Sequence, residues 1–349
     1  MSSGQQRDRA TILPVPANEP RPLWSVMIPT YNCSDQYLRE TLASVLAQDP
    51  GPEVMQIEVV DDRSPDGAPT AIVEELGRGR ITLYQQPTNL GHTRNYSSCL
   101  QRARGKFVHL LHQDDRVQDG FYRAMQQVLD AYPEVGAAFC RVIFMDEQGH
   151  WQSLTPLLQK ENGVLPDALE LIVTQQPLQP PAMVVRRAVY ERLGGFDGRL
   201  ASSAEDTEMW IRIASHYPIG YSVEPLALYR RAHKASLTSR VIRDGSNIRD
   251  CRQANAIYRT YLPAAVADDL VRRGKGPIID WALLLAYDLL QEGDVRTALV
   301  QVREALKTER SLRTIRRVLR LFIGAGIRRL RRALHPPSLL SRTPAQDRR

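Results

Sequence analysis

A regular alternation of strand-like and helix-like segments, beginning at residue 24, is the feature that most constrains this chain. Each short apolar run is followed by a segment whose apolar residues recur at helical spacing. The apolar runs lie at 24–32, 55–62, 80–86, 106–115 and 135–149, and the helical patterns at 36–48, 68–77, 92–103 and 121–132. Repeated β–α units of this kind predict an α/β fold with a mainly parallel sheet and flanking helices on both faces.

Acidic pairs end two of these apolar runs, Asp61-Asp62 in MQIEVVDD and Asp114-Asp115 in KFVHLLHQDD. In parallel sheets the ligand site lies beyond the carboxyl ends of the strands, so we expect both pairs to face one crevice together with the PTYN segment of the first run. An adjacent carboxylate pair can hold Mg²⁺ or Mn²⁺ together with phosphate oxygens. The alternative at either pair is an Asp-rich turn, and at Asp114-Asp115 also the N-cap of a helix starting near Asp119.

A third acidic pair, Glu205-Asp206, opens the helical pattern EDTEMWIRIA. Acids in the first turn of a helix are favoured by the helix dipole, so this pair can be a helix cap. It can instead supply a general base, a carboxylate that accepts the proton of an attacking hydroxyl. The preceding segment LGGFDGRLASSA is rich in glycine and small residues, and it is either a mobile loop beside the site or a connector.

The patterns divide the chain into four parts. Residues 178–235 return to strand and helix patterns, after which only helical patterns follow. We therefore expect a flexible N-terminal arm at 1–23, an α/β domain at 24–240, a helical C-terminal region at 241–310 and a basic amphipathic tail at 311–349.

The net charge of +7 is concentrated in the tail. Residues 311–349 hold eleven arginines and one acid, a net charge of +10, which leaves −3 for the rest of the chain. A body without excess positive charge argues against nucleic acid as a partner. On a helix over 312–334 the apolar residues gather on one side and most arginines on the other, which suits an anionic membrane surface. The alternatives are a helix docked on the body, or disorder after the Pro-Pro pair near residue 336.

The compartment is indicated by what the sequence lacks. No run approaches the roughly 18 to 20 apolar residues of a membrane-spanning helix, and the N-terminal segment has no apolar core of a secretory signal. The four cysteines are scattered, without zinc or disulfide spacing. We therefore expect a cytoplasmic protein that can lie on the inner face of the cell membrane through its tail.

Taken in order, seven segments of the chain resemble the family 2 glycosyltransferases, which have the GT-A (Rossmann-like) fold. The segments are VMIPTYN, VVDDRSPDG, NLGHTRN, GKFVHLLHQDD, GGFD, EDTEMWIRIA and HKAS, spread over roughly residues 24–236. The resemblance implies an inverting transferase that moves a sugar from a nucleotide-diphosphate donor, expected to be a UDP-sugar, to a hydroxyl of a glycan or lipid-linked acceptor. It also implies a place in cell-surface polysaccharide synthesis and Mn²⁺ or Mg²⁺ as the cofactor.

The resemblance implies roles for single residues on the donor side. Pro29, Tyr31 and Asp61 would form the pocket for the nucleotide base. Arg94 would lie near the diphosphate, and Asp114 would face the ribose or the donor sugar. A sugar-phosphate nucleotidyltransferase, which can share a related fold, is the less favoured enzyme, because PTYNCSDQY is not the Gly-rich basic loop that such an enzyme would need.

For the metal and the chemistry, the resemblance implies Asp115 and His233 as metal ligands and Asp206 as the catalytic base, with Glu205 beside it shaping the acceptor site. Asp206 would deprotonate the acceptor hydroxyl on the face opposite the leaving diphosphate, which gives inversion. One position departs from the family pattern, which often has an acid two residues before the Asp-Asp pair and here has His112. This departure keeps two alternatives open: a weakened metal dependence, and a non-catalytic relative that binds a nucleotide or glycan.

Overall fold

The computed structural model describes residues 8–65, 69–231 and 237–334. Within these ranges the strands form one ten-stranded sheet, whose main path runs β3-β2-β1-β4-β9-β6-β10-β5, with β7 paired to β6 and β8 to β10. The strands are β1 (Trp24–Thr30), β2 (Met55–Asp61), β3 (Thr82–Gln85), β4 (Phe107–Leu110), β5 (Arg116–Val117), β6 (Ala137–Met145), β7 (Trp151–Leu154), β8 (Gly163–Val164), β9 (Met183–Arg186) and β10 (Ile219–Arg230).

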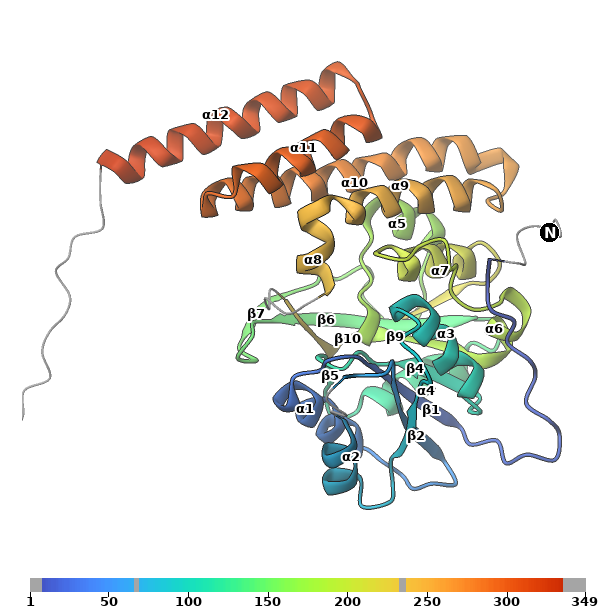
Figure 1. Ribbon diagram of the computed structural model, residues 1–349. Coiled ribbons are helices and arrows are strands. Elements are labelled where there is room, and N and C mark those ends of the chain that lie inside the picture. The colour runs from blue at the N-terminus through green and yellow to red at the C-terminus, as the bar shows by residue number, and fades with distance from the viewer. Residues whose placement is uncertain (1–7, 66–68, 232–236, 335–349) are drawn as a thin grey trace, which may run out of the picture.

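Helices flank this sheet and continue into a separate helical layer (Figure 1). They are α1 (Asp35–Leu46), α2 (Pro69–Gly77), α3 (His92–Arg102), α4 (Phe121–Ala131), α5 (Ala168–Gln175), the 3₁₀ turn η1 (Pro180–Ala182), α6 (Arg187–Leu193), α7 (Glu205–Ala214), α8 (Leu237–Asp244), α9 (Ser246–Arg259), α10 (Ala264–Glu292), α11 (Val295–Thr308) and α12 (Leu312–Leu334). This arrangement confirms the expected α/β fold with flanking helices and a helical C-terminal part.

The sheet is mixed, and its parallel part carries the expected acidic pairs. Strands β3, β2, β1 and β4 run parallel, as do β6 and β10, while β5, β7, β8 and β9 pair antiparallel to their neighbours. Every residue of β1 and β2 is buried, as expected of parallel strands covered on both faces. Thr30 pairs with Asp61 and Met27 with Leu110, so the carboxyl ends of β1, β2 and β4 meet at one edge.

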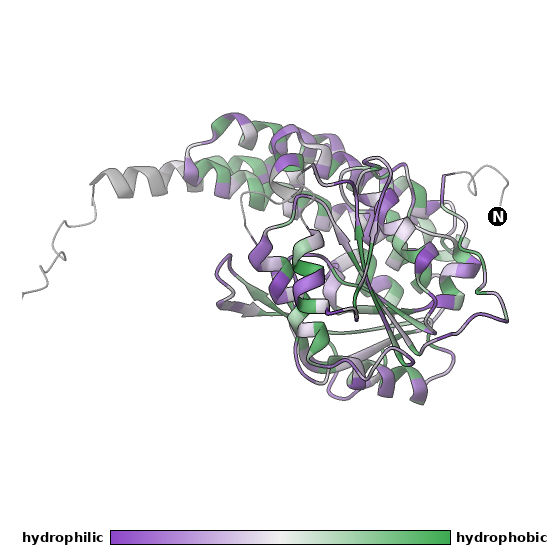
Figure 2. Cartoon of the chain, turned by 60° about the horizontal axis from the view of Figure 1, so that its bottom comes forward, coloured by the Kyte–Doolittle hydropathy of each residue, from purple (hydrophilic) through white to green (hydrophobic). Residues whose placement is uncertain are grey.

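Amphipathic helices supply the two faces that cover the sheet. In α1, for example, Leu38, Leu42 and Val45 are buried at the three- and four-residue spacing of one helical face. Figure 2 shows hydrophobic and hydrophilic residues on different sides of the helices around the sheet. In Figure 1, α5 and α7 lie between the sheet and the layer of α9 to α12, and α1 and α2 lie on the other side of the sheet.

The C-terminal helices share their core with the α/β part of the chain. Tyr258, Leu262 and Leu270 belong to the main apolar core, while Leu200 and Ala204 pack into the core of the helical layer. Helix α10 packs on α5, and α9 packs on α7. The helical region is therefore a continuation of the same packed body, although its sequence pattern differs.

The N-terminal segment is anchored where the structure describes it, which corrects the expectation of a flexible arm for residues 8–23. Ile12 is buried in the main core. The guanidinium of Arg9 donates to Asp197 at 3.2 Å and to Glu208 at 2.9 Å, and all three side chains are buried. Buried charges are retained where each has a partner, so this network holds the segment against the body.

Within the basic tail, residues 312–334 form one helix, α12, which runs through Gly324 and Gly326 without a break. It lies on α10 and α11 at the outside of the helical layer (Figure 1). Among the described helices, none combines the length and apolar character that crossing a bilayer requires. All four cysteines, Cys33, Cys99, Cys140 and Cys251, are buried free thiols.

Candidate active site

The first acidic pair, Asp61-Asp62, holds the edge of the sheet together. Asp61 is fully buried at the end of β2, and its carboxylate accepts hydrogen bonds from Thr30 Oγ1 at 3.0 Å, Ser64 N at 2.9 Å, Ser64 Oγ at 2.6 Å and Gln85 Nε2 at 3.1 Å. Four donors satisfy most of the acceptor capacity of a carboxylate. Asp61 therefore fixes the ends of β1 and β3 relative to β2, and its bonds to Ser64 are those of the Asp-led turn that the sequence allowed.

Asp62 reaches forward to the turn that starts α3. Its two carboxylate oxygens accept from Leu90 N at 2.7 Å and Gly91 N at 2.9 Å. Gly91 has φ 82°, a conformation that favours glycine, and it is the residue before the first residue of α3. Asp62 thus sets the position at which α3 begins, and with it the position of His92.

The second acidic pair lies in the turn after β4, and Arg230 binds it from the end of β10. Asp115 is buried, and its Oδ1 accepts from Arg230 N at 2.9 Å. The Arg230 guanidinium donates to the carbonyl of Asp114 at 3.0 Å and to the Glu40 carboxylate at 2.6 Å, and its Cζ lies 4.1 Å from the centre of the Tyr37 ring. Helix α4 begins later, with Gly120 as its N-cap, so the pair does not cap that helix.

Asp115 has the open oxygen that a metal ion would need. Its Oδ2 is buried and has no hydrogen-bond partner among the described residues, although buried polar atoms are normally paired. No group of three His, Cys, Asp or Glu side chains among the described residues could hold a metal ion alone. Mg²⁺ sites commonly use one or two carboxylates and complete the shell with substrate phosphates and water. The donor set at Asp115 therefore fits a cation that binds together with a diphosphate.

The third acidic pair opens α7, but neither residue is its N-cap. That position is taken by Ala204, with φ 64° and no side-chain cap bond. Asp206 Oδ1 accepts from the backbone N of Thr207 at 2.5 Å and from the hydroxyl of the same residue at 3.2 Å. The pKa of Asp206 rises from its ordinary 3.8 to about 7, because burial disfavours the charged form and the neighbouring Glu205 charge adds to this.

Glu205 forms an ion pair with His92 from the start of α3. Its Oε1 lies 3.4 Å from His92 Nε2, and its buried Oε2 has no partner among the described residues. Burial opposes the charged form of both groups, but the attraction between their opposite charges outweighs the effect of burial. The pKa of His92 is therefore raised and that of Glu205 lowered. Both shifts favour the charged form of the His92–Glu205 pair, which lies beside the high-pKa carboxyl of Asp206.

The second and third acidic pairs meet around the ring of Tyr96 in α3. Burial raises the pKa of Tyr96, and the charges of Glu205, Asp114 and Asp206 raise it further, in that order. The Tyr96 ring stacks on His112, with their centres 5.0 Å apart. Residues from the turn after β4, from α3 and from α7 therefore share one acidic centre at the carboxyl edge of the sheet.

The segment before α7 is held at several points, which favours the connector interpretation over the mobile loop. Leu200 is buried, and its carbonyl accepts from Thr93 Oγ1 at 2.7 Å. The carboxylate of Asp250 in α9 accepts from Ser202 N at 2.7 Å and from Ser203 N at 3.2 Å. The start of α7, and so Asp206, is fixed by contacts from α3 and from the helical layer.

The remaining expected residues lie at different depths around this centre. Pro29 is buried inside β1, Tyr31 is exposed just beyond it, and Arg94 is exposed on α3. The backbone of Tyr31 is tied to Gln113 by bonds of 2.8 and 3.3 Å, which join the ends of β1 and β4. His233 lies outside the described residues.

Three contributors to this centre had no clear signal in the sequence: His92, Tyr96 and Arg230. Tyr96 and His92 are only one turn apart on α3, so a helical reading of NLGHTRNYSS could have placed them on one face. Arg230 reaches Asp115 across 115 positions, and no local pattern encodes that pairing. His112, at the departure from the family pattern, has its pKa lowered by burial and packs as a neutral ring.

Sequence comparison relates this chain to sugar transferases. Residues 25–194 match the family model described as glycosyl transferase family 2. An uncharacterized protein of Mycobacterium tuberculosis is 29% identical over 247 residues, which cover 68% of this chain and 75% of that protein. An uncharacterized glycosyltransferase of Methanocaldococcus jannaschii is 26% identical over 223 residues, 63% of this chain and 75% of that protein. The minor teichoic acid biosynthesis protein GgaB of Bacillus subtilis is 29% identical over 112 residues, 31% of this chain and 12% of that protein.

Solved structures show the same fold at lower sequence identity. S. aureus TarS 1-349 in complex with UDP-GlcNAc matches with a TM-score of 0.59 and 18% identity, over 81% of this chain and 91% of that chain. The mannosyltransferase PcManGT from Pyrobaculum calidifontis, in complex with GDP-Man and Mn²⁺, matches with a TM-score of 0.54 and 20% identity, over 96% of this chain and 86% of that chain.

Proposed function

We propose that this chain, whose residues 25–194 match the family model of the family 2 glycosyltransferases, is itself such an enzyme and transfers a sugar from a nucleotide-diphosphate donor to an acceptor hydroxyl with inversion at the anomeric carbon. The observation that carries the proposal is geometric: Tyr96 of α3 stacks on His112, two residues before Asp114, and His92 of the same helix pairs with Glu205 at 3.4 Å. Asp115 adds a buried oxygen that has no partner among the described residues. One side of this centre suits a cation and a diphosphate, and the other suits proton removal.

Asp206 is the base in this proposal. A carboxyl with a pKa of about 7 is well matched to accept a proton near neutral pH. The acceptor oxygen forms the new bond to the anomeric carbon while its proton passes to Asp206 and the bond to the diphosphate oxygen breaks. Glu205, held by His92 at 3.4 Å, shapes the acceptor side and keeps its own negative charge next to the base. No covalent intermediate with the protein is required.

Asp115 and Asp114 face the donor. Asp115 would hold Mn²⁺ or Mg²⁺ through its free Oδ2, and His233 is a further ligand proposed from the family pattern alone. A divalent cation bound there supplies positive charge to the leaving diphosphate. Arg230 fixes the orientation of the Asp115 carboxylate by donating its backbone N–H to the other oxygen. The orientation of the carboxylate is therefore set before any ligand binds.

The base of the nucleotide would lie at the ends of β1 and β2. Pro29 and Tyr31 form the wall in this proposal, and Asp61 supports it from below through its bonds to Thr30 and Ser64. Arg94, exposed on α3, is free to approach a diphosphate. We propose a UDP-sugar as the donor, by analogy with TarS, although PcManGT was solved with GDP-Man.

The proposed acceptor is a glycan or a lipid-linked glycan of the cell surface. GgaB, whose name places it in minor teichoic acid biosynthesis, supports this class of product. We propose that the reaction takes place in the cytoplasm, next to the inner face of the cell membrane. For the chain as a whole, we propose a transferase domain at 24–240, a helical region at 241–310 and a basic tail at 311–349.

A screen of donors tests the function as a whole. Thermal stabilisation is measured with UDP, GDP and their sugars, each with and without Mn²⁺, and transfer is then assayed with the stabilising donors. We expect stabilisation by one nucleotide class that depends on the metal ion, followed by release of the nucleoside diphosphate when an acceptor is added. Stabilisation with neither hydrolysis nor transfer would instead favour the non-catalytic relative that His112 suggested.

The pH dependence of transfer should report the ionisation of Asp206. The base is active when ionised, and its pKa is about 7. We therefore expect kcat to rise about tenfold per pH unit below that value and to level off above it. Nucleotide binding, measured over the same range, separates this limb from any titration on the donor side. A kcat that stays flat from about pH 5.5 to 8.5 contradicts the assignment of the base.

Replacement of Asp115 should abolish metal-dependent nucleotide binding. Asp115→Ala removes the oxygen proposed to bind the cation, and Asp115→Asn keeps an acceptor for Arg230 N but removes the charge. With either variant we expect Mn²⁺ to give no increase in the affinity for the nucleotide, as measured by isothermal titration calorimetry. Asp119→Asn, an exposed acid nearby, is the matched control and should titrate like the parent. An unchanged manganese titration in both Asp115 variants would refute this role.

A further inference from the structure

Helix α12 presents an apolar stripe to the solvent while a different face of the helix packs on the protein. The exposed stripe is Leu312, Ile315, Leu319, Phe322 and Ile323, at the three- and four-residue spacing of one helical face. Leu312 is 73% exposed, Leu319 57% and Ile323 61%. An amphipathic helix normally turns its apolar side to the core, so an apolar stripe left in water at this length requires an explanation.

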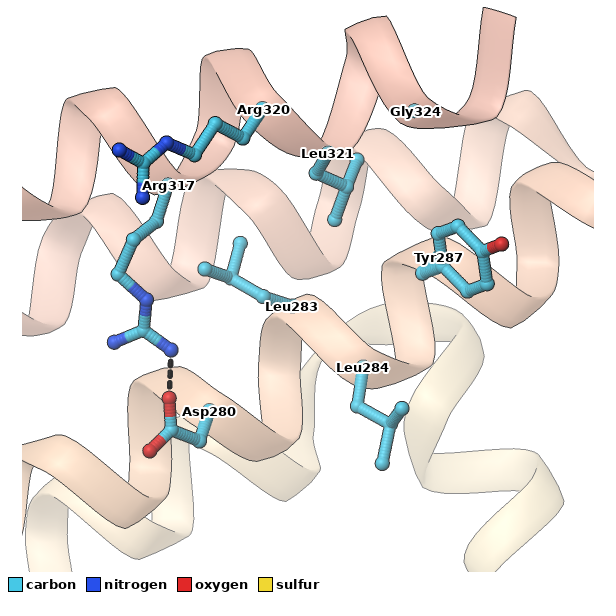
Figure 3. Close-up of a pocket in the computed structure, with 8 residues that line it drawn as sticks. All are labelled: Asp280, Leu283, Leu284, Tyr287, Arg317, Arg320, Leu321 and Gly324. Carbon is cyan, nitrogen blue, oxygen red and sulfur yellow. Dashed lines mark ion pairs between the residues drawn. The ribbon is translucent and has the colours of Figure 1, made fainter. Parts of the chain in front are cut away.

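The docked face of α12 is made by other residues. Thr314, Val318 and Leu321 are buried or half-buried against the helical layer. Arg317, on the same side, forms an ion pair with Asp280 of α10 (Figure 3). Figure 3 shows Leu321 directed toward α10. Because these residues occupy the contact, α12 cannot also bury the exposed stripe against its own body without rotating out of this position.

The charge on the helix identifies the kind of surface that fits the exposed stripe. Arg313, Arg316 and Arg320 are exposed along α12 and form no ion pair with a described acidic residue. The whole segment 312–334 contains eight arginines and no acid. Apolar residues bordered by unpaired arginines match the interface of an anionic bilayer, where the stripe enters the acyl boundary and the guanidinium groups meet lipid phosphates.

We propose that α12 is a membrane-docking helix, which lies flat on an anionic lipid bilayer with the exposed stripe inserted. A second copy of the chain fits less well, because pairing two exposed stripes would bring the arginines of both helices together. Nucleic acid would attract the arginines but would leave the leucines, isoleucines and phenylalanine of the stripe in water. This proposal does not depend on sugar transfer, and either one can fail without the other.

The test is sedimentation of the full chain with lipid vesicles. Vesicles of phosphatidylcholine mixed with phosphatidylglycerol are compared with vesicles of phosphatidylcholine alone. We expect binding to the mixed vesicles only, weakened by added salt because the arginine contacts are screened. The double variant Leu319→Ser, Ile323→Ser should bind about tenfold or more weakly, since both side chains would be removed from the bilayer. Replacing Arg313 and Arg316 with Gln should reduce binding by about fivefold for each arginine.

A matched pair of substitutions controls for the general loss of exposed apolar surface. Leu13→Ser with Leu157→Ser removes two leucines that are 71% and 50% exposed outside α12, and it should leave binding unchanged. Because all four positions are exposed, each double variant should keep the thermal unfolding midpoint of the parent. The proposal is overturned if the parent does not sediment with mixed vesicles, or if the stripe variant binds as well as the parent. The proposal is also overturned if dimerisation is the only property that the stripe variant loses, or if RNA binding is the only property that it loses.

Discussion

Asp206→Asn is expected to lower kcat for sugar transfer by about a hundred- to ten-thousandfold while leaving nucleotide binding nearly unchanged. The substitution keeps the size of the side chain, but an amide cannot accept the proton of the acceptor hydroxyl. Nucleotide binding should persist because Asp206 lies on α7, whereas the oxygen proposed to bind the cation belongs to Asp115. Steady-state transfer with the donor found by screening gives kcat, and calorimetric titration of the nucleotide gives the binding constant.

This variant also distinguishes a catalytic base from a residue that only stabilises the first turn of α7. The amide oxygen of Asn can still accept from the backbone N of Thr207, so the bond at the start of α7 survives. Loss of a cap would reduce stability by about 1 kcal/mol and would not by itself abolish turnover. The raised pKa predicts the opposite sign for stability. Because the pKa of Asp206 is 3.8 in the unfolded chain and about 7 in the folded protein, the parent loses stability as pH rises between these values and stays at the lower level above 7, whereas an Asn side chain does not ionise. We therefore expect the variant to be at least as stable as the parent at pH 8.

Asp250→Asn is the matched control for this experiment. Asp250 is a half-buried acid of the same region that accepts from Ser202 N and Ser203 N, and we assign it no part in proton transfer. It should retain most of its kcat. Full activity in Asp206→Asn would remove the base assignment. An equal loss in both variants would show that the geometry of the connector at residues 193–204, rather than proton transfer, limits the reaction.

The fold was predictable because its signals are local. Buried parallel strands appear as apolar runs, and the topological rule for parallel sheets then places the residues after those runs at one edge. Asp62 and Asp115 were located in this way, and the registers of β1, β2 and β4 confirm that the edge exists. The helical C-terminal region was equally visible from its spacing alone.

The function of each acid at that edge was less accessible, because it depends on partners distant in sequence. In the sequence, Asp61-Asp62 and Asp114-Asp115 are both acidic pairs at the end of an apolar run. In the structure, Asp61 accepts hydrogen bonds from donors that include Thr30 and Gln85, whereas one oxygen of Asp115 has no partner among the described residues. Burial and donor count make this difference, and neither can be counted before the strands are in register. The pairing of Glu205 with His92 could not be predicted for the same reason, because the two residues are distant in sequence and meet only in the folded chain.

The orientation of the tail shows a further limit of sequence patterns. The arrangement of apolar residues and arginines correctly predicted an amphipathic helix over 312–334. It could not show which side would dock, because that depends on the shape and charge that α10 offers. Asp280 attracts Arg317 to the contact, and the apolar stripe through Leu319 is left outside. The N-terminal segment is a similar case, since Arg9 finds its partners nearly 200 residues away.

Arg212→Met is expected to destabilise the protein by about 3 to 5 kcal/mol. Arg212 is fully buried in α7. Its guanidinium donates to the carbonyls of Leu193 at 2.5 Å and Gly195 at 2.9 Å and to the Glu208 carboxylate at 3.1 Å. Methionine fills a similar volume but leaves two buried carbonyls without a donor and Glu208 with one cationic partner fewer. Equilibrium unfolding in denaturant, followed by tryptophan fluorescence and by circular dichroism, measures the change in free energy.

Arg199→Met supplies the comparison that makes this prediction specific. Arg199 is bonded to Asp197 at 2.7 Å, but its side chain is 33% exposed, so water replaces much of what the substitution removes. We expect a loss of no more than about 1 kcal/mol there. A midpoint in Arg212→Met equal to that of the parent would show that α7 holds its position without the buried arginine. A large loss confined to Arg212→Met would instead show that the buried network of Arg212, Glu208 and Arg9 stabilises α7, the helix that carries Asp206, because both arginines bind the Glu208 carboxylate.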